Sequence, residues 1–233
     1  MKALILAGGF GKRLRPYTQE RPKPLIMVAD YPIIVWQIKW LKKYNIDEII
    51  LAVGYLKEKI INEIGSGRKF GINVTYVVEE EPLGTGGAIK NAESVLRKEE
   101  IFFVLNGDII TNLDPTKLVD KIEEQNAIGA LALVPLKSPY GIINFERETG
   151  KILEFVEKPY IKDYWINAGV YCLKPSVFDY LPDKGNVEKI GFPDLAKKGK
   201  LVGVPFGDVF WKAIDTHKDV EEAERLLKSE NFS

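Results

Sequence analysis

The segment Met1–Pro24, MKALILAGGFGKRLRPYTQERPKP, decides how the rest of the chain is arranged. Its apolar run Ala3–Ala7 predicts a buried strand, which ends at the glycine-rich stretch Gly8–Gly11. Glycines let backbone N–H groups approach an anion closely, and clustered N–H groups form an anion-binding nest. Basic side chains follow the glycines, and arginine and lysine both bind phosphate oxygens. These are Lys12, Arg13, Arg15 and, between two prolines, Lys23. The segment therefore predicts a nucleoside triphosphate site.

Two common phosphate-binding motifs do not fit this segment. The P-loop requires a glycine and a serine or threonine at positions where the chain has Leu6 and Arg13. The dinucleotide-binding fingerprint requires a glycine in place of Leu14. The run L-A-G-G-x-G-x-R-L-x-P-x-T, followed by K-P, instead resembles the signature of the sugar-1-phosphate nucleotidylyltransferases. Lys12 departs from that pattern, which usually has serine or threonine there.

This resemblance implies a reaction and a set of residues that carry it out. A nucleoside triphosphate and a sugar 1-phosphate would give a nucleotide-diphosphate sugar and pyrophosphate, with Mg²⁺ as cofactor. The implied catalytic residues are Arg13, Lys23 and Lys158. The implied nucleotide-binding residues are Leu6, Gly8, Gly9, Gly11, Lys12, Arg13, Glu79, Gly84 and Gly86.

The second glycine-rich stretch, Glu79–Gly87, is predicted to be a loop beside the base. Its L-G-T-G-G-A-I run resembles the corresponding loop of mannose-1-phosphate guanylyltransferases. A carboxylate only accepts hydrogen bonds, and guanine presents two adjacent donors, N1–H and the amino group, whereas uracil and thymine present a single N–H between carbonyls. A glutamate in this loop therefore favours guanine. The alternative interpretation is a solvated acidic turn before a helix.

Two aspartates are candidates for metal ligands. Asp108 follows the apolar run at 101–105, and the carboxyl ends of parallel strands are where open α/β sheets bind ligands. Mg²⁺ prefers carboxylate oxygens and usually keeps waters beside substrate phosphates. Most relatives supply a second aspartate from W-x-D-I-G-T-P, but this chain has Ala213 there and Asp215 two residues later. We assign Asp215 as the second ligand; the alternative is that it caps the last helix.

Three further segments resemble the side of these enzymes that faces the sugar phosphate. They contain a Y-G pair, an E-K-P run and the run WINAGVYCL. The resemblance implies that Lys158 meets the phosphate and that Glu157 and Asn167 contact sugar hydroxyls. The full implied set is Tyr140, Gly141, Glu157, Lys158, Asn167 and Gly169.

Alternating strands and helices predict an α/β fold. Strands are expected at 48–53, 72–78 and 101–105, and helices at 31–44, 56–64, 88–99 and 115–125. This order favours a Rossmann-like mixed, mainly parallel sheet flanked by helices, of the nucleotide-diphospho-sugar transferase type. Strand-like runs at 127–136, 141–145, 151–156 and 166–173 predict an antiparallel extension on the sugar side. Short helices at 178–181 and 192–197, a strand at 202–206 and a helix at 218–228 complete the chain.

The predicted organisation is a single nucleotidyltransferase domain over residues 1–233. Its nucleotide-binding half spans 1–126 and its sugar-phosphate-binding half spans 127–233. No hexapeptide repeats are found, so we expect no C-terminal β-helix such as many relatives carry. A homodimer is compatible with the sequence.

The composition argues against several classes of protein. The 33 lysines and arginines balance 33 aspartates and glutamates, so no net positive charge favours nucleic acid. No apolar run approaches the ~20 residues that span a bilayer. The first predicted strand begins at residue 2, which leaves no room for a signal peptide, and we expect a cytoplasmic protein. The single cysteine, Cys172, is expected in the core.

The base and the sugar remain open at this level. GTP and mannose 1-phosphate are the preferred substrates, because the Glu79–Gly87 loop would touch the base. The sequence around Asp215 instead resembles glucose-1-phosphate cytidylyltransferases, so a cytidylyl-, thymidylyl- or uridylyltransferase acting on glucose 1-phosphate is the alternative. An inactive regulatory paralogue and a non-enzymatic sugar-nucleotide-binding module are the other two hypotheses.

Overall fold

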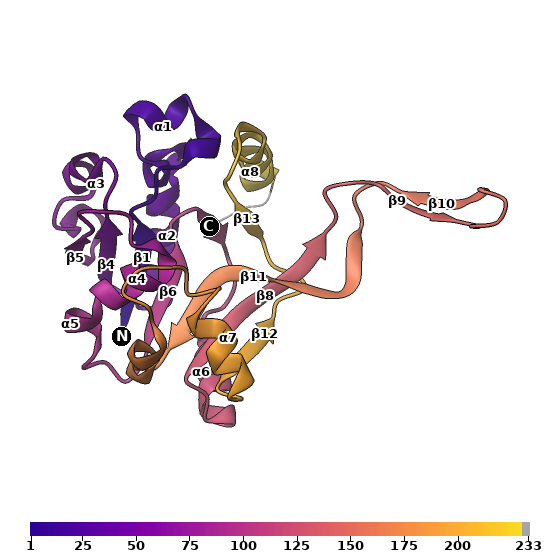
Figure 1. The fold of residues 1–233 in the computed structure, drawn as a ribbon. Coiled ribbons are helices and arrows are strands. Elements are labelled where there is room, and N and C mark those ends of the chain that lie inside the picture. The colour runs from indigo at the N-terminus through magenta and orange to yellow at the C-terminus, as the bar shows by residue number, and fades with distance from the viewer. Residues whose placement is uncertain (230–233) are drawn as a thin grey trace.

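The computed structural model describes residues 1–229, except for the side chains of 162, 163 and 229. Its centre is a seven-stranded sheet in the order β12-β8-β11-β6-β1-β4-β5 (Figure 1). All neighbouring strands are parallel except β11, which is antiparallel to both β6 and β8. The strands are β1 (Lys2–Ala7), β4 (Glu48–Val53), β5 (Asn73–Val78), β6 (Phe102–Asn106), β8 (Gly129–Lys137), β11 (Tyr160–Leu173) and β12 (Leu201–Pro205).

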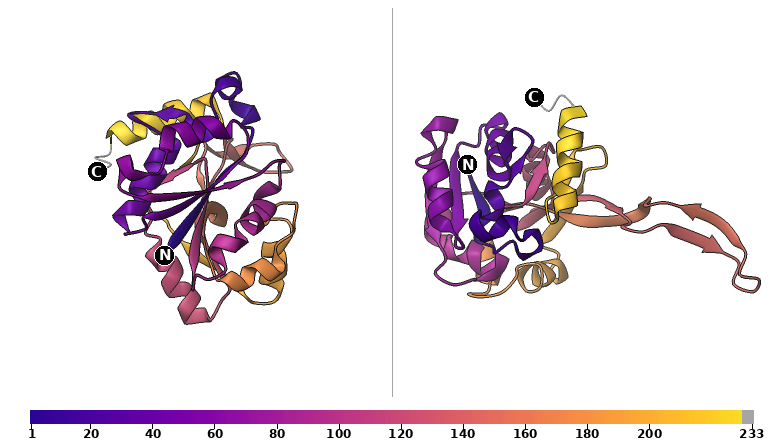
Figure 2. Two further views of the ribbon diagram at one scale, coloured as in Figure 1. Left: turned by 90° about the vertical axis from the view of Figure 1, so that its left-hand side faces the viewer. Right: turned by 90° about the horizontal axis from the view of Figure 1, so that it is seen from above.

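Helices cover both faces of this sheet (Figures 1 and 2). Along β1, Ala3 and Ile5 belong to the hydrophobic cluster on one face, and Leu4 to the cluster on the other, as the two-residue period of a strand requires. The first face packs against α2 (Ile33–Lys43), α3 (Lys57–Ile64) and α6 (Thr116–Gln125). The second packs against α4 (Gly84–Asn91), α5 (Glu93–Leu96), the 3-10 helix η4 (Pro175–Tyr180) and α7 (Gly191–Lys197).

A third hydrophobic cluster joins the two ends of the described chain. It includes Leu14 and Val28 from the opening segment and Ala223 and Leu227 from α8 (His217–Ser229). The short strands β2 (Met27–Val28) and β3 (Tyr31–Pro32) pair with each other, and β7 (Ile109–Thr111) pairs with β13 (Trp211–Ala213). The opening segment also contains η1 (Lys12–Leu14), α1 (Tyr17–Glu20) and η2 (Lys23–Leu25), and η3 (Arg68–Phe70) precedes β5.

The remaining strands, β9 (Ile142–Phe145) and β10 (Ile152–Val156), form a separate antiparallel hairpin. Figure 1 and the right-hand view of Figure 2 show it standing clear of the body. We call residues 140–165 the arm. Every residue of β9 and β10 is exposed to solvent.

The structure confirms the predicted fold class and corrects several element boundaries. The helix expected at 88–99 begins at Gly84 and is interrupted at Ala92. Glycines disfavour helix interiors in general, but the N–H groups of Gly86 and Gly87 donate to the Gly185 carbonyl at 2.9 and 3.2 Å. That tertiary contact outweighs local propensity.

Only part of the predicted antiparallel extension joins the central sheet: β11 does so, whereas β9 and β10 do not. Strand β11 begins at Tyr160, six residues earlier than expected, because Tyr160 still pairs with Lys137 of β8. The strands predicted at 141–145 and 151–156 exist, but they leave the central sheet and form the arm's hairpin. Cys172 is buried as predicted, and burial raises the pKa of its thiol to about 12. Within residues 1–229 no helix has both the length and the apolar character needed to cross a membrane.

Candidate active site

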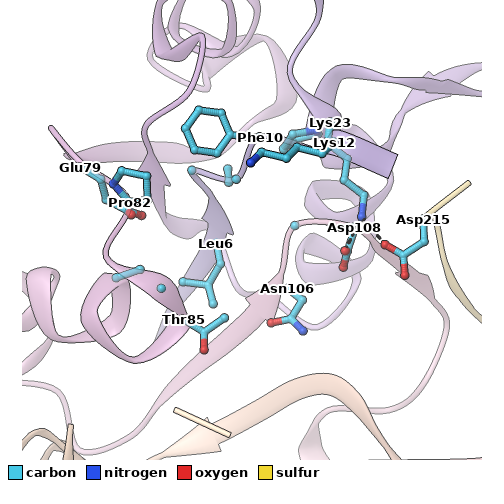
Figure 3. Close-up of a pocket in the computed structure, with 18 of the residues that line it drawn as sticks. Leu6, Phe10, Lys12, Lys23, Glu79, Pro82, Thr85, Asn106, Asp108 and Asp215 are labelled. Carbon is cyan, nitrogen blue, oxygen red and sulfur yellow. Dashed lines mark hydrogen bonds and ion pairs between the residues drawn. The ribbon is translucent and has the colours of Figure 1, made fainter. Parts of the chain in front are cut away.

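A cavity of about 430 Å³ lies at the carboxyl edge of β1 and β6 (Figure 3). Ligand pockets in proteins commonly enclose ~300–1,000 Å³. The predicted residues that line the cavity are Leu6, Gly8, Gly9, Gly11, Lys12, Arg13, Lys23, Glu79, Gly84, Asp108 and Asp215. The structure thus brings together nearly all of the predicted nucleotide and metal residues, from five separate parts of the chain.

The first glycine loop is held in place by hydrogen bonds to its backbone. Thr18 Oγ1 donates to the Gly11 carbonyl at 2.9 Å, and the Tyr55 N–H donates to the Gly8 carbonyl at 3.2 Å. Gly11 has φ 59°, in the left-handed region, and a Cβ there would come within 2.9 Å of Thr18 Cγ2. Only glycine suits that position. The loop then continues into η1, which presents Lys12 and Arg13 to the cavity.

Lys23 joins the two predicted metal aspartates. Its Nζ lies 2.6 Å from Asp108 Oδ2 and 2.8 Å from Asp215 Oδ1 (Figure 3). The lysine side chain is only 14% exposed, and Arg13 Nη2 also contacts Asp215 Oδ1 at 2.9 Å. Two carboxylates separated by 106 residues of sequence therefore share one ammonium group.

The pairing of β13 with β7 explains how Asp215 reaches this position. Ala213 lies opposite Ile109, and the Ile214 N–H donates to the Asp108 carbonyl at 2.9 Å. Asp215 therefore follows directly alongside Asp108, two residues after Ala213, where the resemblance implied an aspartate.

The cap of α8 is supplied by other residues. The Asp219 carboxylate accepts from the Thr216 N–H at 2.8 Å, and Thr216 Oγ1 accepts from the Asp219 N–H at 3.3 Å. This reciprocal pair is a capping box. The Asp215 side chain is thereby left to face Lys23 and Arg13.

This arrangement suits a divalent cation. Mg²⁺ is usually bound through one or two carboxylates together with substrate phosphates and waters. Asp108 and Asp215 supply such a pair, at the cavity that also contains the glycine loop. In the described part of the chain no group of three or more metal-binding side chains comes together, so a bound phosphate would have to complete the coordination.

Among the three adjacent glutamates, Glu79 is the one that lines the cavity. Its Oε2 accepts from the Leu83 N–H at 3.3 Å, and its carboxylate lies against Gly8, where a Cβ would come within 2.7 Å. Burial raises the pKa of Glu79 above its ordinary value, an effect that the Leu83 N–H opposes. Glu80 and Glu81 point outward and pair with Lys57 and Lys184.

A hydrogen-bond chain connects the second glycine stretch to the predicted sugar-side strand. Thr85 Oγ1 donates to Glu188 Oε2 at 2.6 Å, and the Tyr171 hydroxyl donates to Glu188 Oε1 at 3.4 Å. Asn167 Nδ2 in turn donates to the Tyr171 hydroxyl at 2.8 Å. Burial raises the pKa of Tyr171, so its hydroxyl stays protonated and can donate. This chain couples the position of Asn167 to that of α4.

Several predicted residues do not line the cavity. Gly86 is buried against the loop that contains Pro182 and Gly185, where a Cβ would come within 2.9–3.0 Å of that loop. In this position it sets how closely α4 packs against that loop. Asn167 is exposed to solvent and does not line the cavity. Gly169 is buried behind Asn106, whose side chain a Cβ on Gly169 would meet at 2.8 Å.

The other four predicted sugar residues lie on the arm. Tyr140 and Gly141 are on one leg of its root, and Glu157 and Lys158 are on the other. Lys158 has φ 47° and its Nζ pairs with the neighbouring Glu157 at 3.1 Å. None of the four lines the cavity in this arrangement.

The cavity also contains residues that sequence reasoning did not assign. Asn106 is one, and its Oδ1 is buried without a hydrogen-bond partner among the described residues. The run Asn106-Gly107-Asp108 predicts a metal ligand through its aspartate, and the polar Asn106 at the carboxyl end of β6 is a second signal of a site residue. Phe10, Pro82, Thr85 and Asn186 also line the cavity. Nothing local marks Asn186, because it arrives through tertiary packing.

The fold and the cavity together define a nucleotide-diphospho-sugar transferase type of protein. The chain belongs to the nucleotidyl transferase family, whose pattern matches residues 2–230. It is 39% identical over 225 residues to a mannose-1-phosphate guanyltransferase of Yarrowia lipolytica and 38% identical over 228 residues to that of Saccharomyces cerevisiae. Each match covers 94% of this chain and 62% of the relative, so the chain spans less than two thirds of these proteins.

Solved structures show the same fold. A putative glucose-1-phosphate thymidylyltransferase from Bacillus anthracis, in complex with a sucrose, superposes with a TM-score of 0.80 at 28% identity, covering 100% of this chain and 97% of its own. HddC from Yersinia pseudotuberculosis complexed with GMP-PN superposes with a TM-score of 0.71 at 26% identity, covering 97% and 99%.

Proposed function

We propose that this chain is a Mg²⁺-dependent nucleotidylyltransferase that converts GTP and mannose 1-phosphate to GDP-mannose and pyrophosphate. The observation that carries the proposal is the convergence of the glycine loop, Lys23, Asp108 and Asp215 at one cavity. The similarity to mannose-1-phosphate guanyltransferases supports the choice of substrates. A cytoplasmic location is part of the proposal, because the reaction consumes a nucleoside triphosphate.

The reaction needs positioning and charge neutralisation, with no covalent intermediate. An oxygen of the sugar phosphate attacks the α-phosphorus, the bond to the bridging oxygen of the β-phosphate breaks, and pyrophosphate leaves with that electron pair. Arg13 and the amides of the Gly8–Gly11 loop bind the departing pyrophosphate. Lys23 bridges toward the α-phosphate, and Lys158 holds the attacking phosphate.

Asp108 and Asp215 would hold Mg²⁺, which supplies charge neutralisation at the phosphates. Lys23 now pairs with both aspartates, so metal binding requires this ammonium to release at least part of that contact. The same movement would free Lys23 for the substrate.

Guanine selection is assigned to Glu79. Its carboxylate lines the cavity, whereas Glu80 and Glu81 are paired elsewhere. An ionised carboxylate can accept from both N1–H and the amino group of guanine. Leu6 and Gly84 also line this cavity.

A second candidate is a thymidylyl- or cytidylyltransferase acting on glucose 1-phosphate. It is favoured by the structural similarity to the putative glucose-1-phosphate thymidylyltransferase and by the run from Trp211 to Thr216. On either alternative the phosphate and metal residues keep the same roles, and only the base and sugar contacts differ.

One assay separates these candidates. Purified protein with Mg²⁺ is mixed with each of ATP, GTP, CTP, UTP and dTTP, and with mannose or glucose 1-phosphate, and pyrophosphate release is followed. We expect the highest rate for GTP with mannose 1-phosphate. A preference for dTTP or CTP with glucose 1-phosphate would support the second candidate, and no release with any pair would contradict an enzyme for these sugars.

Arg13→Ala and Lys43→Ala form a matched pair for the same assay. The Arg13 side chain is 72% exposed, so its removal should leave folding intact while pyrophosphate release collapses. Lys43 lies at the exposed end of α2 and does not line the cavity, so its variant should retain the wild-type rate. Unchanged activity in Arg13→Ala would remove that residue from the mechanism.

A further inference from the structure

Gln37 is a polar side chain that helix α2 buries against the turn containing Asp108. Its side chain is 2% exposed, and the other buried residues of α2 are aliphatic or aromatic. The amide Nε2 donates to the Asn106 carbonyl at 2.8 Å and to the Ile109 carbonyl at 3.0 Å. A side-chain amide has two N–H donors. One amide group therefore binds both of the carbonyls that flank Gly107 and Asp108.

The oxygen of the same amide has no comparable contact. Gln37 Oε1 is buried and lacks a hydrogen-bond partner among the described residues. An unpaired buried oxygen costs free energy, and methionine would fill a similar volume without that cost. The amide cannot turn over to relieve it, because both of its contacts are carbonyls and only N–H groups can donate to them. The chain therefore tolerates an unpaired acceptor at a position that supplies two donors to this turn.

The backbone of Asp108 is also held from two other sides. The Gly107 N–H donates to the Leu6 carbonyl of β1 at 3.0 Å. The Asp108 carbonyl accepts from the Ile214 N–H, directly after β13, at 2.9 Å. With Gln37 from α2, three separate parts of the chain each bind a backbone group at or beside Asp108.

The contact of Gln37 also bears on the second candidate metal ligand. Ile109, whose carbonyl Gln37 binds, begins β7 and lies opposite Ala213 of β13. Asp215 is two residues after Ala213, and its carboxylate shares one ammonium with that of Asp108 (Figure 3). Because paired strands shift together, a displacement of Ile109 would change the spacing of the two carboxylates.

We propose that Gln37 is a positioning residue for the Mg²⁺ site. It holds the turn at Asp108 and, through the pairing of β7 with β13, the segment that contains Asp215, so that both carboxylates face the cavity before a metal binds. This inference rests on the proposed function, which assigns Mg²⁺ to these two aspartates. Groups behind the direct ligands orient them, and their removal typically lowers metal affinity about 10–100-fold. Gln37 does not line the cavity, so it acts through the backbone.

Calorimetric titration of Mg²⁺ without nucleotide tests this role. Gln37→Met keeps the length of the side chain and removes both donors together with the unpaired oxygen, so circular dichroism should show a folded variant. Its dissociation constant for Mg²⁺ should exceed the wild-type value by about tenfold or more. A wild type without measurable Mg²⁺ binding, or an unchanged constant in folded Gln37→Met, would overturn the proposal.

Trp40→Phe is the matched control from the same helix. Trp40 is also buried, and its Nε1 donates to the Leu113 carbonyl at 2.8 Å, after the end of β7. This variant therefore loses the same kind of helix-to-backbone contact, but not one that flanks Asp108. It should lose stability in urea and keep the wild-type affinity for Mg²⁺. Equal weakening of Mg²⁺ binding in both variants would indicate a general loss of packing and would overturn the role of Gln37.

Gln37→Asn provides the same test if Gln37→Met fails to fold. Asparagine keeps the amide but is one methylene shorter, so it cannot reach both carbonyls from the same backbone position. We expect weaker Mg²⁺ binding than in the wild type. Wild-type affinity in Gln37→Asn would show that the bridge between the two carbonyls does not matter, and would refute the proposal.

The dependence of pyrophosphate release on Mg²⁺ concentration gives a second measurement. Excess Mg²⁺ compensates for poorly placed ligands, so the concentration for half-maximal rate should rise in Gln37→Met by about the same tenfold factor. The maximal rate should stay near the wild-type value. A lower maximal rate with unchanged half-saturation would assign Gln37 a general structural role and contradict the proposal.

The two hypotheses fail in different ways. If no substrate pair releases pyrophosphate but Gln37→Met still weakens Mg²⁺ binding, the proposed function is refuted while the positioning role stands, because calorimetry does not depend on turnover. If the wild type is active and Gln37→Met binds Mg²⁺ as the wild type does, the positioning role is refuted while the proposed function stands.

Discussion

Lys23 is the residue on which the charge balance of the cavity depends. It contacts both Asp108 and Asp215, and its side chain is largely buried. An ammonium in this position neutralises two carboxylates that would otherwise repel each other, and it competes with any divalent cation for the same oxygens. A lysine can therefore preserve a metal site in the absence of metal.

Lys23→Ala should bind Mg²⁺ more tightly than the wild type when no nucleotide is present. A hydrogen bond to a charged group contributes about 1.5–3 kcal/mol, and removing this competitor should raise affinity roughly tenfold, which corresponds to about 1.4 kcal/mol. Calorimetric titration of Mg²⁺ into the purified variant would measure this. Turnover should nevertheless fall, because the substrate phosphates lose the lysine.

Lys12→Ala provides the matched control. Lys12 also lines the cavity, but its ammonium lies over the Phe10 ring, 5.6 Å from the centroid. Its removal should leave Mg²⁺ affinity without nucleotide near the wild-type value. Equal or weaker Mg²⁺ binding by Lys23→Ala would show that the lysine does not compete with the metal.

The value of kcat/KM for GTP should fall on the acid side of its pH profile, and Glu79 should place this fall at a higher pH than an ordinary glutamate would. Burial raises its pKa above the ordinary value of 4.5, and only the ionised form can accept from both guanine donors. We expect kcat/KM for GTP to reach a plateau above this raised pKa and to fall as the pH is lowered through it. Since kcat/KM reports groups of the free enzyme, a pH profile measures this directly.

Glu79→Gln and Glu80→Gln separate this effect from general acid inactivation. Glu79→Gln should lower kcat/KM for GTP by roughly tenfold or more, because a hydrogen bond to a charged group contributes about 1.5–3 kcal/mol. In this variant the fall of kcat/KM at low pH should also disappear. Glu80→Gln should keep the fall of kcat/KM at low pH, because Glu80 is exposed and pairs with Lys57. A fall that is identical in Glu79→Gln and the wild type would rule out Glu79 as its source.

At the scale of elements, the two glycine-rich stretches differ in what they do. The first is a loop whose backbone borders the cavity, whereas the second is largely the beginning of α4. Gly86 and Gly87 in α4 are buried, and their amides bond to the Gly185 carbonyl. Their glycine character therefore serves packing between α4 and the loop before α7.

Gly86→Ala and Gly9→Ala should separate these roles. A Cβ at Gly86 would meet Pro182 and the Gly185 carbonyl at 2.9–3.0 Å, so we expect a loss of about 1–3 kcal/mol of unfolding free energy, as for other overpacked sites. A Cβ at Gly9 has no atom within 4 Å, so that variant should keep its stability and lose affinity for GTP. Urea denaturation and GTP titration measure the two effects. Equal stability of the two variants would contradict the packing role of Gly86.

At the scale of the whole molecule, the body and the arm have different stabilities. The body has hydrophobic clusters on both faces of its sheet and a third cluster that fastens α8 to the opening segment. Strands β9 and β10 contribute no residue to any of these clusters. Folding of the body should therefore not depend on the hairpin.

A variant in which a short glycine turn replaces residues 142–156 should keep the fold of the body. Because β9 and β10 add no residue to the hydrophobic clusters, its melting temperature should lie within a few degrees of the wild type, the shift expected for about 1 kcal/mol in a chain of this size. Differential scanning calorimetry measures this, and loss of the cooperative transition would show that the body needs the hairpin.

The sequence by itself determined the fold class and most of the residues that line the cavity. Strand β4 was predicted at its observed bounds, because the five apolar residues Ile49–Val53 form a run of strand length that Gly54 ends. The glycine loop and its cations are contiguous, so local spacing alone assigns Gly8, Gly9, Gly11, Lys12 and Arg13 to one place. Asp108 is similarly placed by the rule that strand ends meet at one edge of a parallel sheet.

Only the tertiary structure decided the features that depend on distant contacts. Asp215 lies at the cavity because β13 pairs with β7, a contact between segments about one hundred residues apart, and no local pattern distinguishes that outcome from a helix cap. Helix α4 begins among glycines because a remote carbonyl binds their amides. The strand-like runs at 141–145 and 151–156 correctly predict two strands, but strand propensity is local and does not say that they leave the central sheet and pair with each other.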